Sequence, residues 1–205
     1  MKGIAVLLVV GACNGEINAM SDAPHGGGGS DSGGSGSADV PGGVGEPANL
    51  MGITLYHNQV RAAVDTTGIA AGPLPPMKWD PDLATYAAQW AAMCKDTELP
   101  MGLVDHDPNR TNVAGYAYIG ENIFGASGSA TAKGAVDLWA SEKTYFTYPS
   151  TCTAPMGQSC GHYTQVVWRT SVNVGCALQE CSGLQYGSTI VCDYGPGGND
   201  GGAPY

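Results

Sequence analysis

The chain has 205 residues and a formal net charge of −10, with 8 lysines and arginines against 18 acidic residues. Such a surface repels phosphate backbones and anionic lipid headgroups, which argues against nucleic acid and a purely electrostatic membrane contact as partners. Hydrophobic residues make up 43% of the chain, enough for the core of one compact domain with additional segments.

The first 22 residues have the pattern of an export signal. The apolar run 4–10 follows a single lysine and is shorter than the ~20 residues that a membrane-spanning helix needs. The residues leading to Cys13 resemble a bacterial lipobox, in which the cysteine is lipidated and becomes the mature N-terminus. The alternative is a plain secretory signal cleaved near Ala12 or Ala19. We therefore expect an extracytoplasmic protein, either a bacterial lipoprotein held at the membrane only by its lipid anchor or a freely secreted one.

Residues 23–48 form the next segment, which is rich in Gly, Ser, Asp and Pro. A segment of this composition cannot bury much apolar surface, so we expect a disordered tether. The composition becomes that of a globular protein from about Asn49, and the remaining residues 49–205 are predicted to form one domain.

Three helices are predicted in the first part of this domain. The first ends near Gly68 and places four apolar residues on one face: Leu55, Val60, Ala63 and Val64. The second begins with Asp80 as N-cap and Pro81 in the first helical position. Its apolar residues recur at helical spacing: Leu83, Ala87, Trp90, Ala91 and Cys94. The third covers about residues 130–143.

Strands are predicted in the second part of the domain. Residues 161–168 alternate, and residues 174–178 and 188–192 are short apolar runs. Helices followed by short strands indicate an α+β fold, with helices packed against a largely antiparallel sheet.

The cysteines agree with export from the cytoplasm. Six of the seven follow residue 90, and Cys13 is the odd one, which the lipobox interpretation explains. An even set of six predicts three disulfides and an oxidising compartment. The sequence alone leaves their pairing open.

Histidine and glutamate side chains are the main candidates for chemistry, because the chain has no serine-hydrolase elbow, zinc-protease helix motif, phosphate-binding loop or dinucleotide fingerprint. His162 would share one face of a strand with Trp168 and sit half-buried at the core edge. Glu142 follows Trp139 by three residues on the third predicted helix, so it lies at the core margin and needs a partner. Glu121 precedes an apolar residue and is similarly constrained.

Several motifs resemble those of the CAP superfamily, which comprises the cysteine-rich secretory proteins, antigen 5 and pathogenesis-related 1 proteins. Residues 161–168 (Gly-His-Tyr-Thr-Gln-Val-Val-Trp) match its main signature throughout. Residues 192–199 resemble the second signature, although Asp193 stands where the family usually has Asn or another uncharged or basic residue. Shorter matches are found at residues 57–61, 72–74, 79–80, 120–122 and 139–143. The resemblance covers residues 50–205 and implies an SCP domain, an α-β-α sandwich with a central, mostly antiparallel sheet.

The resemblance also implies a site of two histidines and two glutamates, which are His106, Glu121, Glu142 and His162. Two imidazoles and two carboxylates suit zinc or another divalent cation. The histidines would bind the cation directly, and the glutamates would orient them or act as bases toward a bound water. The alternative is a buried polar network that only supports the fold. Residues 105–118, which include His106, form a longer and more polar segment than the resemblance to plant members of the family leads us to expect.

We expect a structural role for His57, because the residue at this helix position in the CAP superfamily mainly packs and forms hydrogen bonds. The resemblance, together with the adjacency of the predicted strands, implies the disulfides Cys94–Cys181, Cys152–Cys160 and Cys176–Cys192.

Three functions remain open. The first is an extracytoplasmic binding module whose cleft, or an apolar groove beside it, takes a lipid or sterol, a glycan or a protein. The second is a metal-assisted hydrolase, which ranks lower because the sequence offers no obvious oxyanion donor. The third is a cell-surface display domain without a small ligand. We expect a monomer.

Overall fold

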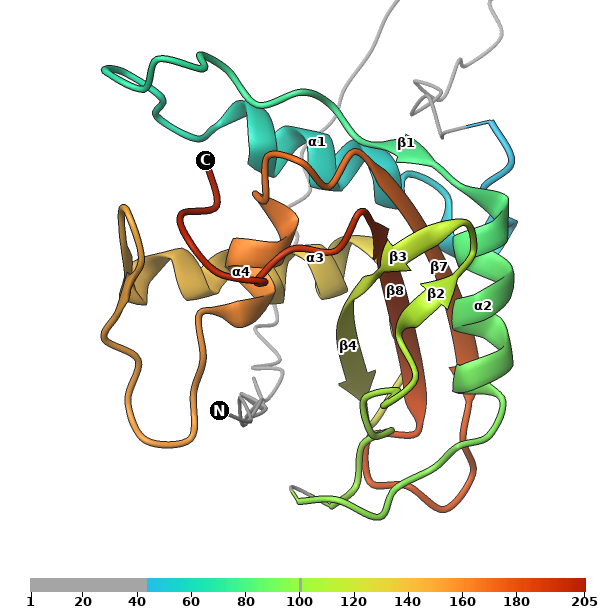
Figure 1. Cartoon of the computed structure of the whole chain (residues 1–205). Helices are drawn as coiled ribbons and strands as arrows, with labels where there is room; N and C mark the ends of the chain where they lie inside the picture. The colour runs from blue at the N-terminus through green and yellow to red at the C-terminus, as the bar shows by residue number, and fades with distance from the viewer. Residues whose placement is uncertain (1–43, 100) are drawn as a thin grey trace, which may run out of the picture.

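The structure is a computed structural model that describes residues 44–99 and 101–205 (Figure 1). The export signal, Cys13 and residues 23–43 of the predicted tether lie outside the described residues. Within the described ranges, no helix is both long and apolar enough to cross a membrane.

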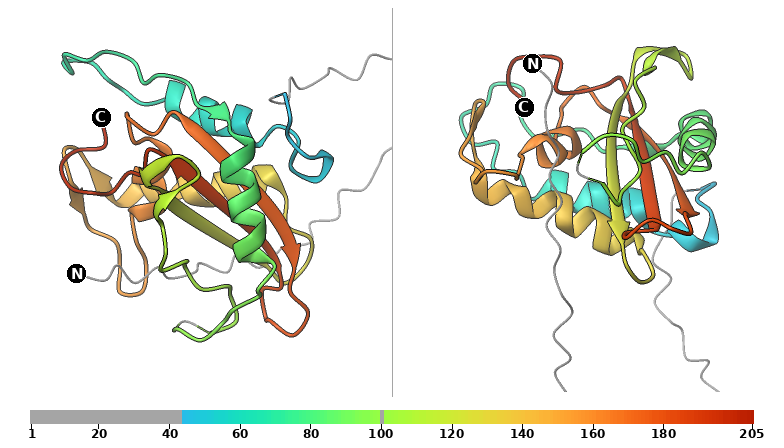
Figure 2. Two further views of the ribbon diagram at one scale, coloured as in Figure 1. Left: turned by 45° about the vertical axis from the view of Figure 1, so that its right-hand side comes forward. Right: turned by 90° about the horizontal axis from the view of Figure 1, so that it is seen from below.

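A four-stranded sheet with helices on both faces forms the centre of the fold (Figure 2). In sheet order, its strands are β1 (Lys78–Trp79), β7 (Asn173–Glu180), β8 (Ser188–Gly195) and β4 (Gly120–Ala126). β1 is parallel to β7, whereas the other two pairs are antiparallel. The predicted α+β class and the largely antiparallel sheet are therefore confirmed.

The helices form two outer layers. One face of the sheet is covered by α2 (Pro81–Ala91), and the other by the remaining α-helices, as the right-hand view of Figure 2 shows. These are α1 (Ile53–Ala62), α3 (Ala132–Ser141) and α4 (Gly161–Val166). Two 3₁₀ helices, η1 (Ala48–Leu50) and η2 (Glu142–Tyr145), accompany them. Short hairpins are formed by β2 (Thr111–Val113) with β3 (Tyr116–Tyr118), and by β5 (Phe146–Thr147) with β6 (Thr151–Cys152).

Each face of the sheet has its own hydrophobic core, because side chains alternate along a strand. On β4, Ile123 faces α2 and packs with Trp90. Phe124, its neighbour, faces the other layer and packs against the core that contains Trp139. The strand that carries Glu121 is thus anchored by apolar contacts on both sides.

Helix α2 forms as predicted. The Asp80 side chain accepts hydrogen bonds from the backbone N–H groups of Asp82 (2.9 Å) and Leu83 (3.2 Å), and Pro81 occupies the first helical position. The helix lies very close to β7, because a Cβ added at Gly175 would come within 2.1 Å of the backbone nitrogen of Ala84. Glycine at this position is therefore what allows helix and strand to pack in direct backbone contact.

Helix α1 exists, and Val60 and Val64 of its predicted apolar face pack against the core, but its end and the rest of its buried face were predicted wrongly. The helix ends at Ala62, and its buried residues include His57 and Arg61 rather than Ala63, which is exposed. These two polar side chains are buried because each forms hydrogen bonds with the backbone or with other buried groups. An apolar periodicity cannot detect a helix face of this kind.

The N-terminus of α1 is capped from the segment that the sequence assigned to the tether. Glu46 is buried, and its carboxylate accepts hydrogen bonds from the N–H groups of Gly52 (2.7 Å) and Thr54 (3.0 Å). A carboxylate at this end of a helix satisfies free N–H groups and complements the helix dipole. The contacts of the domain therefore begin before Asn49.

Residues 161–168 were predicted to be a strand, but the structure places α4 there. Tyr163, Val166 and Val167 are buried, which is helical spacing rather than alternation. Two of the first N–H groups of this helix are satisfied by the Glu142 carboxylate, which stabilises such a short helix against unfolding. The predicted third helix is α3 followed by η2, so Glu142 lies just beyond the α-helix proper.

The described residues form three disulfides: Cys94–Cys181, Cys152–Cys160 and Cys176–Cys192. These are the pairs that the resemblance implied. Cys176 and Cys192 are directly opposite each other on β7 and β8, and Cys94–Cys181 links the segment after α2 to the end of β7. Such bonds persist in oxidising compartments, so the domain belongs outside the cytoplasm.

Candidate functional site

Two histidine–glutamate pairs lie near the start of β4. In the first pair, His106 Nδ1 donates to Glu121 Oε1 at 2.5 Å, and the N–H of Asp107 donates to the same oxygen at 3.1 Å. The side chain of Glu121 is only 1% exposed, whereas that of His106 is 35% exposed. The carboxylate therefore lies behind the imidazole, which faces the solvent.

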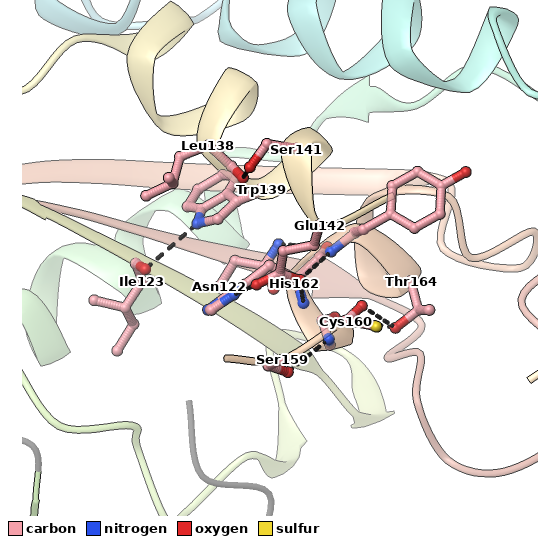
Figure 3. Close-up of polar contacts among 12 residues, drawn as sticks. Asn122, Ile123, Leu138, Trp139, Ser141, Glu142, Ser159, Cys160, His162 and Thr164 are labelled. Atoms are coloured by element: carbon pink, nitrogen blue, oxygen red, sulfur yellow. Dashed lines mark hydrogen bonds and ion pairs between the residues drawn. The ribbon is translucent and has the colours of Figure 1, made fainter. Parts of the chain in front are cut away.

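The second pair joins η2 to α4, as Figure 3 shows. His162 Nδ1 donates to Glu142 Oε1 at 2.6 Å, while Glu142 Oε2 accepts hydrogen bonds from the N–H groups of His162 (2.9 Å) and Tyr163 (3.0 Å). The His162 ring also stacks on Trp139, with ring centroids 6.4 Å apart and an interplanar angle of 18°. One carboxylate thus fixes both the start of the helix and the orientation of its imidazole.

The two pairs meet at one cleft with a cavity volume of about 210 Å³. His106, Glu121 and His162 line this cleft, and Glu142 supports His162 through Nδ1. The structure therefore brings together all four residues proposed from the sequence, which lie on four different parts of the chain. The rest of the lining is mostly polar: Arg110, Tyr118, Gly120, Asn122, Ser159, Gly161, Gln165, Gly198 and Asn199.

The hydrogen bonds define which imidazole nitrogen is available to a ligand. A carboxylate only accepts hydrogen bonds, so Nδ1 carries the proton in both His106 and His162. In the neutral imidazole, Nε2 then keeps its lone pair, which is the arrangement of metal-binding histidines with carboxylate partners. Among the described residues, no group of three or more His, Cys, Asp or Glu has a geometry that would hold a metal ion. A cation here would have two protein ligands, and water or ligand oxygens would complete its coordination.

Asn122 connects the cleft to a buried polar chain that the sequence analysis missed. Its side-chain amide donates to the carbonyl of His162 (3.1 Å) and to the hydroxyl of Tyr194 (3.1 Å). The Tyr194 hydroxyl is also bonded to His57 Nε2 (2.8 Å), while His57 Nδ1 donates to the carbonyl of Ile53 (2.8 Å). Side chains alternate along β4, so Asn122 points away from Glu121. This alternation was the sequence signal that could have identified Asn122.

His57 has the structural role expected from the sequence. It is fully buried, and burial lowers its pKa from 6.5 to about 4, although its hydrogen bond to Ile53 opposes this shift. A buried imidazole without a carboxylate partner remains neutral, and it links α1 to β8 through Tyr194.

A third carboxylate lies behind the first pair. Asp193 on β8 is directly opposite Glu121 on β4, and only 1% of its surface is exposed. Neither oxygen of Asp193, nor Oε2 of Glu121, has a hydrogen-bond partner among the described residues. Burial and then the Glu121 charge raise the pKa of Asp193 well above its ordinary value, and Arg110 opposes this shift.

A second, more apolar groove adjoins the cleft. Its volume is about 400 Å³, and Phe146, Trp168 and Pro204 contribute to its walls. Ser159, Gly161 and Asn199 line both cavities, so the two share a rim.

The fold is an α-β-α sandwich with three disulfides, and two histidine–glutamate pairs lie beside its edge strand. These features define a class of disulfide-stabilised extracytoplasmic domains. Comparisons with known proteins agree with this assignment to a class of extracytoplasmic domains. Residues 55–194 match the model of the cysteine-rich secretory protein (CAP) family. Pathogenesis-related protein 1A of Nicotiana tabacum is 38% identical over 152 residues, which are 73% of this chain and 76% of that protein. GLIPR1-like protein 1 of Homo sapiens is 36% identical over 170 residues, which are 80% of this chain and 64% of that protein.

Solved structures show the same fold. The venom allergen-like protein 4 of Schistosoma mansoni aligns with a TM-score of 0.60 and 28% identity, covering 78% of this chain and 95% of its own. A crystal structure of NaASP2 with Zn²⁺ aligns with a TM-score of 0.53 and 27% identity, covering 75% and 82%. The chain belongs to the CAP family.

Proposed function

We propose that this chain is an extracytoplasmic binding module whose cleft holds a divalent cation, such as Zn²⁺, through Nε2 of His106 and His162. The observation behind the proposal is that both imidazoles donate Nδ1–H to a carboxylate and line one cleft, which leaves two lone pairs for a cation. The zinc-containing structure of NaASP2, a relative with the same fold, supports the choice of Zn²⁺ as the cation. When bound, such a cation would act as a Lewis acid that attracts an oxygen atom of a ligand.

The ligand would occupy the cleft and, where it has an apolar part, the adjoining groove. The shared rim at Ser159, Gly161 and Asn199 supports this extension from a polar to an apolar site. A lipid, a sterol, a glycan or a protein segment would each use this surface in a different way. We also propose that the protein is a monomer and that a lipid attached to Cys13 anchors it to the membrane.

We rank a metal-assisted hydrolase lower. A general base must reach a water molecule in the cleft. The side chain of Glu121 is 1% exposed, and the carboxylate of Glu142 already accepts three hydrogen bonds. A display domain without a small ligand is the remaining alternative, and it would bind neither cation nor ligand.

Calorimetric titration with zinc chloride tests the proposal. The wild type should bind one zinc ion per chain, and the double variant His106→Ala, His162→Ala should bind none. A Glu142→Gln variant keeps both ligands but loses the charge behind His162, so its affinity should fall by about 10–100-fold. His25→Ala is the matched control, because this histidine belongs to the segment 23–48 that the sequence predicts to be a tether. Equal zinc binding by the wild type and the double variant would refute the assignment.

A further inference from the structure

The three arginines of this chain are used in two different ways. Arg61 is 2% exposed, and its guanidinium donates to the carbonyl groups of Pro75 (2.9 Å), Val166 (2.9 Å), Trp168 (2.8 Å) and Arg169 (3.4 Å). The Nη atoms of Arg169 donate to the carbonyl groups of Ala71, Gly72 and Pro73. Both side chains therefore bind the chain's own backbone.

Arg110 is the exception. Its Nε–H donates to the carbonyl of Asp107 at 2.8 Å, and its guanidinium lies 5.9 Å from the centre of the Tyr118 ring. Within the described residues, no hydrogen bond or ion pair engages Nη1 or Nη2. The side chain is half-buried and lines the same cleft as His106 and His162.

The segment that carries Arg110 is packed against the rest of the domain. Arg110 precedes the hairpin of β2 and β3, and the carbonyl of Tyr118 accepts a hydrogen bond from the N–H of Gly197 (2.9 Å) in the loop after β8. A Cβ added at Gly197 would come within 2.4 Å of the Tyr118 ring, so glycine is needed for this close approach. With Nε bonded and the ring beside it, the guanidinium is positioned before any ligand arrives, which reduces the entropy lost on binding.

We propose that Arg110 forms an oxyanion-binding subsite in the cleft, and that this subsite takes the carboxylate group of a ligand. Two free Nη groups on a fixed guanidinium match the two oxygens of a carboxylate or the oxygens of a phosphate. Glu121 lines the same cleft as Arg110, and its buried carboxylate repels a dianion more than a monoanion, so a carboxylate is preferred. The inference rests on the cleft being the ligand site, as proposed above, but it does not require the cation.

NMR on the ¹⁵N-labelled full chain, in the presence of a chelator, tests this subsite. The probes are butanoate, its uncharged analogue butanamide, and methyl phosphate. Butanoate should shift the Nε–H signal of Arg110 and the backbone signals around His106, whereas butanamide should not. Methyl phosphate should bind more weakly than butanoate. Tighter binding of methyl phosphate would overturn the preference for a carboxylate.

Variants complete the test. Arg110→Gln should weaken butanoate binding by about tenfold or more. Arg110→Lys keeps the charge but lacks the planar pair of N–H donors, so its butanoate affinity should lie between those of Arg110→Gln and the wild type. Lys133→Gln removes an exposed charge elsewhere and should leave binding unchanged. Equal shifts with butanoate and butanamide, unchanged affinity in Arg110→Gln, or no wild-type binding up to about 50 mM would each overturn the subsite.

The His106→Ala, His162→Ala variant separates this inference from the proposed cation site. It should lose zinc but still bind butanoate through Arg110. Zinc binding without butanoate binding would leave the cation site standing and remove the subsite, and the opposite result would do the reverse.

Discussion

Glu121 and Asp193 are directly opposite each other on neighbouring strands, although both are carboxylates and both are buried. Like charges on adjacent strands destabilise a sheet, and burial adds a desolvation penalty to each. His106 bonds to one oxygen of Glu121, whereas Asp193 has no hydrogen-bond partner among the described residues. The first prediction follows from this asymmetry.

Asp193→Asn should stabilise the protein at neutral pH by about 1–3 kcal/mol, because the amide is uncharged and can donate to the free oxygen of Glu121. The pKa of Asp193 is raised in the folded state, so the folded protein binds this proton more tightly than the unfolded chain does. Wild-type stability from this group therefore falls as the pH rises from the unfolded value of 3.8 through the raised folded value.

Urea unfolding between pH 4 and 8 measures this effect, with the exposed Asp200→Asn as the control. The variant should lose this part of the pH dependence, and the control should keep it. An Asp193→Asn protein that is less stable than the wild type at pH 7 would show that the charge is compensated.

His57 predicts a pH dependence of the opposite sign. Its folded pKa of about 4 lies below the unfolded value of 6.5, so the folded state favours the neutral form. Stability from this group is complete above about 6.5 and falls by up to about 3 kcal/mol as the pH decreases toward 4. NMR titration of the His57 ring in the folded protein should show a largely neutral ring at pH 5. A midpoint near 6.5 would contradict the buried, neutral assignment.

The contact between α2 and β7 gives a third prediction. Gly175→Ala should destabilise the domain by about 2–3 kcal/mol, because its Cβ would overlap with the backbone of Ala84, which cannot move independently of the helix. Gly128→Ala is the matched control, since a Cβ at that position meets nothing within 4 Å. Thermal unfolding of the two variants compares them, and similar melting temperatures would mean that helix and strand can separate freely.

The disulfides should differ in their contribution to stability. Cys94–Cys181 closes a sequence separation of 87 residues, whereas Cys152–Cys160 closes 8. Loop-closure entropy then predicts a loss of about 4–5 kcal/mol for the double alanine variant of the first bond and about 2–3 kcal/mol for that of the second. Guanidinium unfolding under non-reducing conditions measures both values. A larger loss for Cys152–Cys160 would show that strain or unfolded-state structure outweighs loop length.

The features that sequence predicted well are those determined by local rules. The cap at Asp80, the proline that follows it and the apolar spacing to Trp90 define α2 without reference to the rest of the molecule. The apolar runs of β7 and β8 indicate buried strands for the same reason. The resemblance to the CAP family supplied the site residues, which no local pattern would have brought together.

The features that it missed depend on contacts between distant segments. Helix α4 is stabilised by the carboxylate of Glu142, 20 residues earlier, so its short sequence could be mistaken for a strand. The buried face of α1 includes Arg61, whose partners include the carbonyl groups of Val166 and Trp168, more than 100 residues away. Arg110 is recognisable as a candidate ligand contact only after the bonds of Arg61 and Arg169 are known.

The two imidazoles of the cleft are attached to different layers. His106 belongs to the loop after α2 and is braced by the edge strand, whereas His162 begins a helix on the opposite face of the sheet. A cation shared by both would therefore act as a removable cross-link. Its binding would slow amide hydrogen exchange on both sides of the sheet at once, so that occupancy of a small polar site would change the rigidity of the whole domain.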